Sequence, residues 1–257
     1  MMELTQRNYH SRKANREFMS VSQFKSFDRC QHAALAELTG KYEREQTTAL
    51  LVGQYIDSYF EGTLEKFMQQ TPEIFKRDGT LKAEYAQAEA IIERIKRDKL
   101  FMQFMSGKKQ VIMTGEICGV PVKIKIDSLL PDKIVDLKIM RDFENVYDAE
   151  KGSLPFFEGW GYDLQGAVYQ EIVRQNTGKT LPFYLAIATK EKTADIDIIH
   201  MNRKSLDFAL DHFKANVELY DAIKKRIIEP ERCGKCDYCK ETKVLTEPRD
   251  SEEFYLF

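Results

Sequence analysis

The chain has 257 residues and a formal net charge of −2, with 43% hydrophobic and 31% charged residues. This is an ordinary globular composition with enough residues for a sizeable core, and no stretch is long and apolar enough to cross a bilayer. The first residues lack the apolar core of a secretion signal, so we expect a cytoplasmic protein with reduced thiols. The near-neutral charge gives no support to a protein that simply coats DNA, although carboxylates that hold a metal could mask a basic groove.

Three segments are expected along the chain: a flexible basic arm over 1–19, one domain over 20–240, and a polar tail over 241–257. Amphipathic periodicity predicts helices, with Ser20 or Ser22 as the first N-cap, at 20–38, 48–67, 81–105, 160–175 and 205–228. Alternating or β-branched residues predict strands at 111–117, 120–130, 134–139, 181–189 and 194–200. Helices that flank and interrupt one group of strands indicate a single α/β domain.

The two strands over 120–130 and 134–139 carry the densest group of polar residues. Side chains alternate between the two faces of a strand. Asp127 therefore lies on the face of its strand opposite the isoleucines, and Asp136 and Lys138 share one face of the next strand. If the strands pair, Asp127, Asp136 and Lys138 converge at one end of a hairpin.

Two carboxylates at this separation are suited to magnesium or manganese, which prefer oxygen ligands, and the backbone carbonyl of Leu137 could join them. The metal would polarise a phosphate and acidify a bound water, while Lys138 would orient that water or stabilise the developing charge. The alternative is a solvated face of an edge hairpin, because short motifs of this kind also occur by chance.

Further polar residues could join this pair. Gln165 and Tyr169 are four residues apart on a predicted helix and suit a phosphate or a metal-bound water. Glu116 could add a third carboxylate, and Asp57 and Glu61 lie one helical turn apart. Taken singly, each of these residues is equally well explained as part of a helix or strand surface.

Together these residues resemble the PD-(D/E)xK nuclease superfamily, and most of all the exodeoxyribonuclease VIII (RecE-like) proteins of phages and prophages. Asp127 matches the first metal aspartate, Asp136-Leu137-Lys138 matches the (D/E)xK motif, and Gln165 with Tyr169 matches the QxxxY motif of the RecB-like branch. The resemblance spans roughly 20–240, and the order and spacing of the motifs are more specific than any one of them. Asp57 follows Gly53 where RecB-like proteins often carry a histidine ligand.

The resemblance implies a restriction-endonuclease-like core, with a central mixed sheet, the hairpin at its centre and helices on both sides. It also implies a magnesium- or manganese-dependent DNA exonuclease in a bacterial host cell, which resects duplex ends for single-strand annealing recombination. Its partners would be duplex DNA ends, a single-strand annealing protein and further copies in a ring. The alternatives are a nuclease that trims DNA for another pathway, as in CRISPR adaptation, and a DNA-binding protein without catalysis. The complete set of Asp127, Asp136 and Lys138 argues against the last of these.

Three of the five cysteines, Cys233, Cys236 and Cys239, lie within seven residues. Such a run can bind one side of a metal centre, and Cys30 or Cys118 could supply a fourth ligand. Cys118 sits in a predicted strand region, where a small buried thiol is ordinary. Resemblance to AddB and the CRISPR adaptation nucleases implies that Cys30 is the fourth ligand of a structural [4Fe–4S] cluster. Zinc on the same four thiolates is the alternative, and three free thiols in a surface turn is another.

Overall fold

The structure is a computed structural model that describes residues 2–148, 151–248 and 250–251. Its helices in this part of the chain are α1 (Arg12–Glu17), α2 (Val21–Arg29), α3 (Gln31–Thr39), α4 (Thr48–Glu61), α5 (Leu64–Gln70), η1 (Pro72–Ile74), α6 (Ala83–Lys96), α7 (Lys99–Phe104), α8 (Phe156–Gly159), α9 (Tyr162–Thr177), α10 (Arg203–Lys224) and α11 (Asp237–Glu241). Its strands are β1 (Lys108–Ile117), β2 (Val120–Leu130), β3 (Lys133–Met140), β4 (Val146–Asp148), β5 (Gly152–Leu154), β6 (Phe183–Thr189) and β7 (Ile196–His200). No helix among the described residues has the length and apolar character that crossing a membrane requires.

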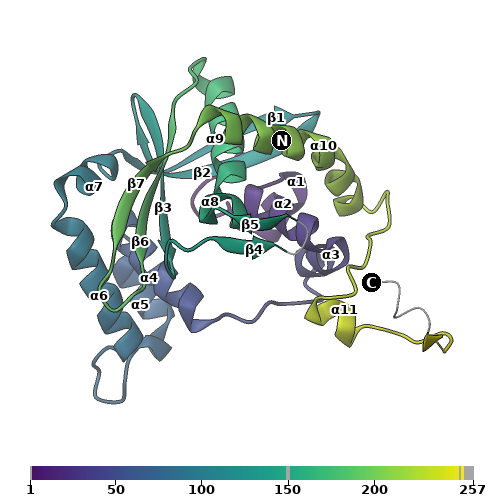
Figure 1. Ribbon diagram of the computed structural model, residues 1–257, viewed down its shortest axis with the longest axis horizontal. Coiled ribbons are helices and arrows are strands. Elements are labelled where there is room, and N and C mark those ends of the chain that lie inside the picture. Colours follow the sequence, from purple (N-terminus) through teal and green to yellow (C-terminus); the bar gives the residue numbers. More distant parts are fainter. Residues whose placement is uncertain (1, 149–150, 249, 252–257) are drawn as a thin grey trace.

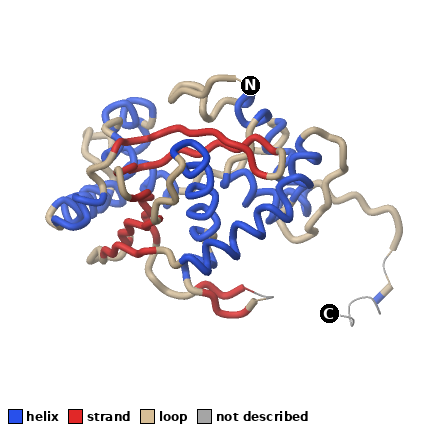
Figure 2. The backbone as a smooth tube through the Cα atoms, turned by 90° about the horizontal axis from the view of Figure 1, so that it is seen from above, coloured by secondary structure: helices blue, strands red, loops and turns tan. Residues whose placement is uncertain are grey.

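Five strands form one mixed sheet in the order β1-β2-β3-β6-β7. The pairs are antiparallel except that of β3 with β6, which is parallel and connected by a crossover through α9, the geometry that a parallel pair requires. Helices lie on both sides of this sheet (Figure 1), while β4 and β5 form a separate hairpin that stands apart from it (Figure 2). The expected α/β fold, a central mixed sheet flanked by helices, is confirmed.

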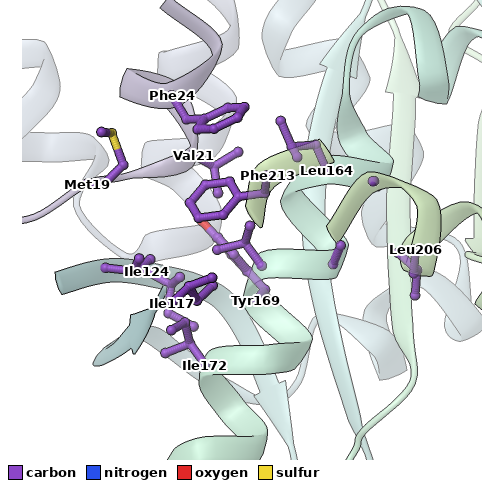
Figure 3. Packing of buried hydrophobic residues seen from close by; sticks show 14 of the residues in the cluster. Met19, Val21, Phe24, Ile117, Ile124, Leu164, Tyr169, Ile172, Leu206 and Phe213 are labelled. Atoms are coloured by element: carbon purple, nitrogen blue, oxygen red, sulfur yellow. The ribbon is translucent and has the colours of Figure 1, made fainter. Parts of the chain in front are cut away.

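Two apolar clusters fix the sheet between its helices. One lies against α2, α9 and α10, where Phe24, Tyr169 and Phe213 pack around the isoleucines of β2 (Figure 3). The other joins α4, α6 and α7 to Val135 and Leu137 on the opposite face of β3. Because both faces of the central strands are buried, the register of β3 is firmly specified, and with it the direction in which its polar side chains point.

Three helices that the periodicity predicts as continuous are interrupted in the structure. The one over 20–38 breaks at Cys30, whose extended backbone ends α2 and caps α3. The one over 48–67 ends at Glu61 because Gly62 adopts a left-handed conformation with φ of 75°, a common helix terminator. The one over 81–105 stops at Lys96, and Asp98 then caps α7 through the backbone N–H of Phe101. Hydrophobic periodicity runs through these breaks, so it marks the buried face without showing where the helix stops.

Residues 2–19 pack on the domain, which corrects the expectation of a flexible arm over this segment. Met19 bridges to β2, with its N–H donating to the Pro121 carbonyl at 2.7 Å and the Lys123 N–H donating back to its carbonyl at 2.9 Å. Phe18 is fully buried, and its carbonyl accepts a hydrogen bond from the buried Lys224 ammonium at 2.8 Å. β3 pairs only with the end of β2, and the segment around Met19 covers the edge of β2 that is left open near Val122. This pairing avoids an exposed strand edge, which would be unfavourable. The end of the expected polar tail, 252–257, lies outside the described residues.

Candidate active site

The candidate site lies where β2 and β3 separate. Their pairing joins Ser128 to Val135 and continues toward the turn, but it stops just before Asp127 and Asp136, which would be the next opposed pair. Instead, the backbone N–H of Leu137 donates to Asp127 Oδ2 at 3.0 Å. A side chain therefore replaces a backbone partner in the ladder, and the two carboxylates are left facing the gap.

Asp136 is buried, with 1% of its surface exposed, and its two oxygens have different partners. Gln165 Nε2 donates to Oδ1 at 2.6 Å, while Lys138 Nζ lies 2.5 Å from Oδ2. The lysine contact is an ion pair without hydrogen-bond alignment, because Oδ2 has no hydrogen-bond partner among the described residues. The ammonium of Lys138 thus compensates the charge of this buried oxygen, while the hydrogen-bonding capacity of the oxygen stays unused.

Burial raises the pKa of Asp136 to about 7; the Lys138 ammonium lowers it, and the neighbouring Asp127 charge raises it. Burial alone would lower the pKa of Lys138, yet that pKa is raised, because Asp136 and Asp127 stabilise the ammonium. The lysine therefore stays charged at neutral pH. Asp136 lies near the midpoint of its titration, so its ionisation depends on what approaches the site.

Asp57 and Glu61 from α4 line a small cavity with Asp127, Gln110 and Leu137. Burial raises the pKa of Asp57 well above its ordinary value, and the charge of Asp127 raises it further. Burial also raises the pKa of Glu61, and Lys125 opposes this effect. The expected one-turn spacing of Asp57 and Glu61 thus brings both carboxylates toward the hairpin.

These residues fit a magnesium or manganese ion. The donors are carboxylate oxygens, which such ions prefer, and they are held together against their mutual repulsion. Oδ2 of buried Asp136 contacts Lys138 Nζ but accepts no hydrogen bond among the described residues, so it keeps the capacity to bind an ion as well. Asp127, Asp136 and Asp57 would hold the ion, and the ion would supply the polarisation of a phosphate and the acidification of a water.

Gln165 and Tyr169 both reach this region from α9, but they contact protein groups. Gln165 holds Asp136, as described above, and the Tyr169 hydroxyl donates to the Lys125 carbonyl at 2.9 Å. Contact of this pair with a phosphate or a metal-bound water stays a prediction. The two side chains of one helix fix the two separated strands at the edges of the gap.

Glu116 lies outside the site. It is exposed on β1 opposite Pro121, and its backbone N–H and carbonyl are both bonded to the Gln175 side chain. The β1 residue opposite Asp127 is Gln110, six residues away, which corresponds to about 20 Å along a strand. The Glu116 carboxylate therefore does not join those of Asp127 and Asp136.

Gln110 is a residue of the site that the sequence did not predict. It has a φ of 52° within β1, a left-handed conformation that non-glycine residues seldom adopt. Its Nε2 donates to Asp127 Oδ1 at 3.2 Å, so each oxygen of Asp127 accepts one hydrogen bond. Strained backbone of this kind occurs at functional sites, and no sequence pattern announces it here.

Two residues from the N-terminal part of the chain also reach the site. Lys25 Nζ donates to the Trp160 carbonyl at 2.5 Å, and its pKa is lowered to about 8 by burial and by repulsion from Lys138. Burial and the charge of Asp127 raise the pKa of Tyr9, whose ring lies beneath the Lys125 ammonium at 5.7 Å. Neither residue was predicted, because both are far in the sequence from Asp127 and Asp136. Tyr9 also lies in the segment 1–19, which was expected to be a flexible arm.

The second group of interest joins Cys30, Cys233, Cys236 and Cys239, whose four sulfur atoms all lie within 4.8 Å of one another. Individual Sγ–Sγ distances are 3.6 Å from Cys30 to Cys239, 3.7 Å from Cys30 to Cys236, and 4.0 Å from Cys233 to Cys239. The group connects the α2–α3 junction to α11 at the rim of the molecule (Figure 1). The choice of Cys30 over Cys118 is supported, because Cys118 is exposed in the β1–β2 turn with a φ of 50°, and is not buried in a strand as expected.

Backbone N–H groups surround these sulfurs. Ala33 donates to Cys30 Sγ at 3.5 Å, Cys236 to Cys233 Sγ at 3.3 Å, and Cys239 to Cys236 Sγ at 3.4 Å. Two of these bonds are also helix N-caps, so the positive ends of α3 and α11 face the sulfurs. Although burial acts to raise it, the pKa of Cys233 is lowered to about 6 by such donors, whereas burial raises the pKa values of Cys30 and Cys236. Cysteine binds metal as the thiolate, so a bound cation would have to stabilise the charged form of the buried sulfurs.

Residues 20–242 match a family model described as a PDDEXK-like domain of unknown function. The match covers most of the chain, and the chain therefore belongs to this family. A crystal structure described as a putative exonuclease from Eubacterium rectale is 48% identical in sequence, covers 99% of this chain and 98% of its own, and superposes with a TM-score of 0.94. A second solved chain, described as SSO0001, is 14% identical, covers 80% of this chain and 89% of its own, and has a TM-score of 0.31, too low to carry an argument. A search of curated proteins found no match.

Proposed function

We propose that this protein is a metal-dependent nuclease that hydrolyses phosphodiester bonds in DNA at the gap between β2 and β3. The observation that carries the proposal is the buried Asp136 carboxylate, which pairs with Lys138 and keeps Oδ2 without a hydrogen-bond partner. A structural ion pair would have no need of Asp127 and Asp57 beside it, because like charges in a buried site repel one another.

Each residue has a separate task in this proposal. Gln165 and the Leu137 N–H fix the positions of Asp136 and Asp127, so that a bound ion meets oriented oxygens. Lys138 keeps its proton and presents positive charge to the phosphate oxygens as negative charge develops on them. A divalent ion bound to the carboxylates supplies the Lewis acidity and the acidified water.

We further propose an exonuclease of the RecE-like type, which resects duplex ends in the bacterial cytoplasm before single-strand annealing. The motif order over Asp127, Asp136-Leu137-Lys138 and Gln165 to Tyr169 supports this branch, as does the 48% identical protein described as a putative exonuclease. An annealing protein and a ring of further copies remain proposals that rest on resemblance. A DNA-trimming role in another pathway would use the same site.

The test is digestion of end-labelled linear duplex DNA and of covalently closed circular DNA in magnesium or manganese, with the Asp136→Asn protein as a matched control. We expect linear DNA to be degraded, circles to be spared, and the variant to be inactive. Rapid linearisation of circles would refute the exonuclease, and an Asp136→Asn protein as active as the wild type would refute the site.

We also propose that the four cysteines bind one metal centre with a structural role. Four thiolates around a single zinc ion, with Zn–S bonds of about 2.3 Å, lie about 3.8 Å apart in a tetrahedron. The distances of 3.6 to 4.0 Å agree with that value. In an iron–sulfur cluster each thiolate binds a different iron, which separates the sulfurs further. The geometry therefore favours zinc over the cluster that the resemblance implies.

Elemental analysis and absorbance of anaerobically purified protein distinguish these outcomes. One equivalent of zinc in a colourless protein would support the single ion. A brown protein with iron and acid-labile sulfide would establish the cluster instead. Protein free of both metals, yet equally stable in chelator, would exclude a metal site.

A further inference from the structure

A groove of about 460 Å³ lies beside the candidate site, between the hairpin of β4 and β5 and the start of α9. Its lining includes Tyr147 from β4, Trp160 between α8 and α9, and Tyr162 at the beginning of α9. Tyr147 is 79% exposed and Trp160 is 53% exposed. Among the residues that the structure describes, neither of these two rings packs on another aromatic ring. A groove of this size is in the range that binds small molecules or single units of a polymer.

The groove borders the candidate site at Tyr162, which lines the groove and lies next to Lys138. The Lys138 ammonium lies 5.4 Å from the centre of the Tyr162 ring, and the Lys25 ammonium lies 5.6 Å from it. Lys25 also holds the Trp160 backbone through its carbonyl, as described above. The indole is therefore attached to a fixed backbone while its ring stays accessible, which lowers the entropy cost of binding a flat partner.

The charges of the groove favour a neutral partner over a phosphate chain. Its lining has two cations, Arg141 and Lys190, and two acids, Asp142 and Glu144. Arg141 pairs with Asp142 at 2.5 Å and lies 3.9 Å from Glu144, and Lys190 Nζ donates to the Ala49 carbonyl at 3.2 Å. The carboxylates of Asp142 and Glu144 would repel a phosphate chain that entered this groove. Exposed aromatic rings suit the faces of nucleobases, which are flat, uncharged and able to stack whatever their sequence.

We propose that this groove receives an unpaired nucleobase adjacent to the phosphodiester at the carboxylates, by stacking on Trp160 and Tyr147. This inference rests on the proposed nuclease function and narrows its substrate. Bases inside a duplex have both faces covered by their neighbours and are held by pairing, so an unpaired base that can enter the groove comes from a frayed or single-stranded segment. The protein would then bind DNA whose end is open more tightly than DNA whose ends are closed.

Trp160 is the one tryptophan in the sequence, so the fluorescence of the full-length protein reports on this groove alone. The Asp136→Asn protein, in magnesium, is titrated with a single-stranded thymidine 12-mer and with a relaxed, covalently closed circular duplex, which has no ends and should not quench. We expect saturable quenching by the single strand, and Tyr147→Ala in the same background to weaken its binding roughly tenfold. Phe208→Ala, which removes a 77% exposed ring on α10, is the matched control and should leave the affinity unchanged.

In a second series, DNA binding is measured by the fluorescence anisotropy of the DNA. This measurement does not depend on the fluorescence of Trp160, which the variants lack. Trp160→Phe keeps a ring and should bind within about twofold of the parent, whereas Trp160→Ala should lose roughly tenfold. Unchanged fluorescence on addition of single strands, or equal affinity in Trp160→Ala, would overturn the inference. Cleavage of linear DNA by the wild-type protein is measured separately, so that a failure of the groove and a failure of the nuclease proposal are distinguishable.

Discussion

The carboxylate site and the cysteine site use opposite kinds of donor in different parts of the fold. Asp127 and Asp136 lie at the centre of the sheet, where a break in strand pairing leaves the two carboxylates facing a gap. Cys30 and Cys239 lie at the rim, where helices from the two ends of the sequence meet and the sulfurs face one another. The first group is held by other side chains, Gln165 and Lys138 among them, while the second is held mainly by backbone N–H groups.

This difference suits the carboxylate site to catalysis and the cysteine site to stabilising the fold. Hard oxygen donors with an unfilled position suit an ion that must also contact a substrate, whereas four soft sulfur donors close around an ion and leave no position for one. A chain that contains both sites can therefore lose one function and keep the other. Four predictions test that separation, from the largest expected effect to the smallest.

Replacing Asp136 with alanine should lower the cleavage rate by at least about a hundredfold, because a metal ligand and the partner of Lys138 are both lost. The melting temperature should fall, because Lys138 and the Gln165 amide lose their partner in a buried site, although Asp127 still offsets part of the lysine charge. Steady-state cleavage of linear duplex and a thermal melt measure the two quantities. A variant that is unfolded at room temperature would show that the site serves the fold.

Replacing Cys30 with serine should lower the free energy of unfolding by roughly 3 to 5 kcal/mol, because the link between residues 30 and 239 closes a very long loop. Cleavage by the fraction that remains folded should be close to that of the wild type. Chemical denaturation measures the loss, with Cys118→Ser as the matched control, because Cys118 is exposed and lies outside the sulfur group. Equal destabilisation by the two substitutions would contradict a special role for Cys30.

Magnesium should raise the melting temperature more at pH 8 than at pH 5.5. The folded-state pKa of Asp136, about 7, is above the ordinary value of about 3.9, so the folded protein binds a proton there that the unfolded chain has released. Without metal, this group's contribution to stability declines as the pH rises from about 4 to about 7. A divalent ion binds the carboxylate and reverses that loss, chiefly above pH 7. Calorimetric melts at both pH values measure the difference, and Asp136→Asn should remove most of it.

Replacing Gln110 with alanine should weaken manganese binding to the DNA-free protein by a few fold, because Asp127 loses one of its two hydrogen-bond donors. Titration calorimetry measures the affinity. The control is Gln175→Ala, which removes a glutamine that bonds to the other end of β1. A purely structural role for Gln110 would lower the melting temperature and leave the metal affinity unchanged.

The strands and the central hairpin could be predicted from the sequence because their information is local. Alternation over Val122, Ile124 and Ile126 fixes which face of β2 is buried, and the short separation between Asp127 and Asp136 leaves little choice of register. The Cys30 assignment required the family resemblance, because spacing alone left Cys118 open. The buried sulfurs of the structure agree with Cys30.

What could not be predicted depends on contacts between distant segments. Glu116 has the right residue type on the right strand, but the length of β1 carries it away from the gap. Gln110 reaches Asp127 only because its backbone is left-handed, and Tyr9 does so only because the N-terminal segment follows the open edge of β2. Polar residues in a basic segment are typical of a disordered arm, and the buried Lys123 and Lys224 that anchor this one are far away in the sequence.

The sulfur group also has a consequence for synthesis. Cys30 leaves the ribosome early, whereas the other three ligands are among the last residues to emerge, 203 to 209 positions later. Until then Cys30 lacks the other three sulfurs of the group. If the group binds a metal ion as proposed, loading requires a chain translated past Cys239, so a bound ion would be a chemical record that these last ligands have been synthesised.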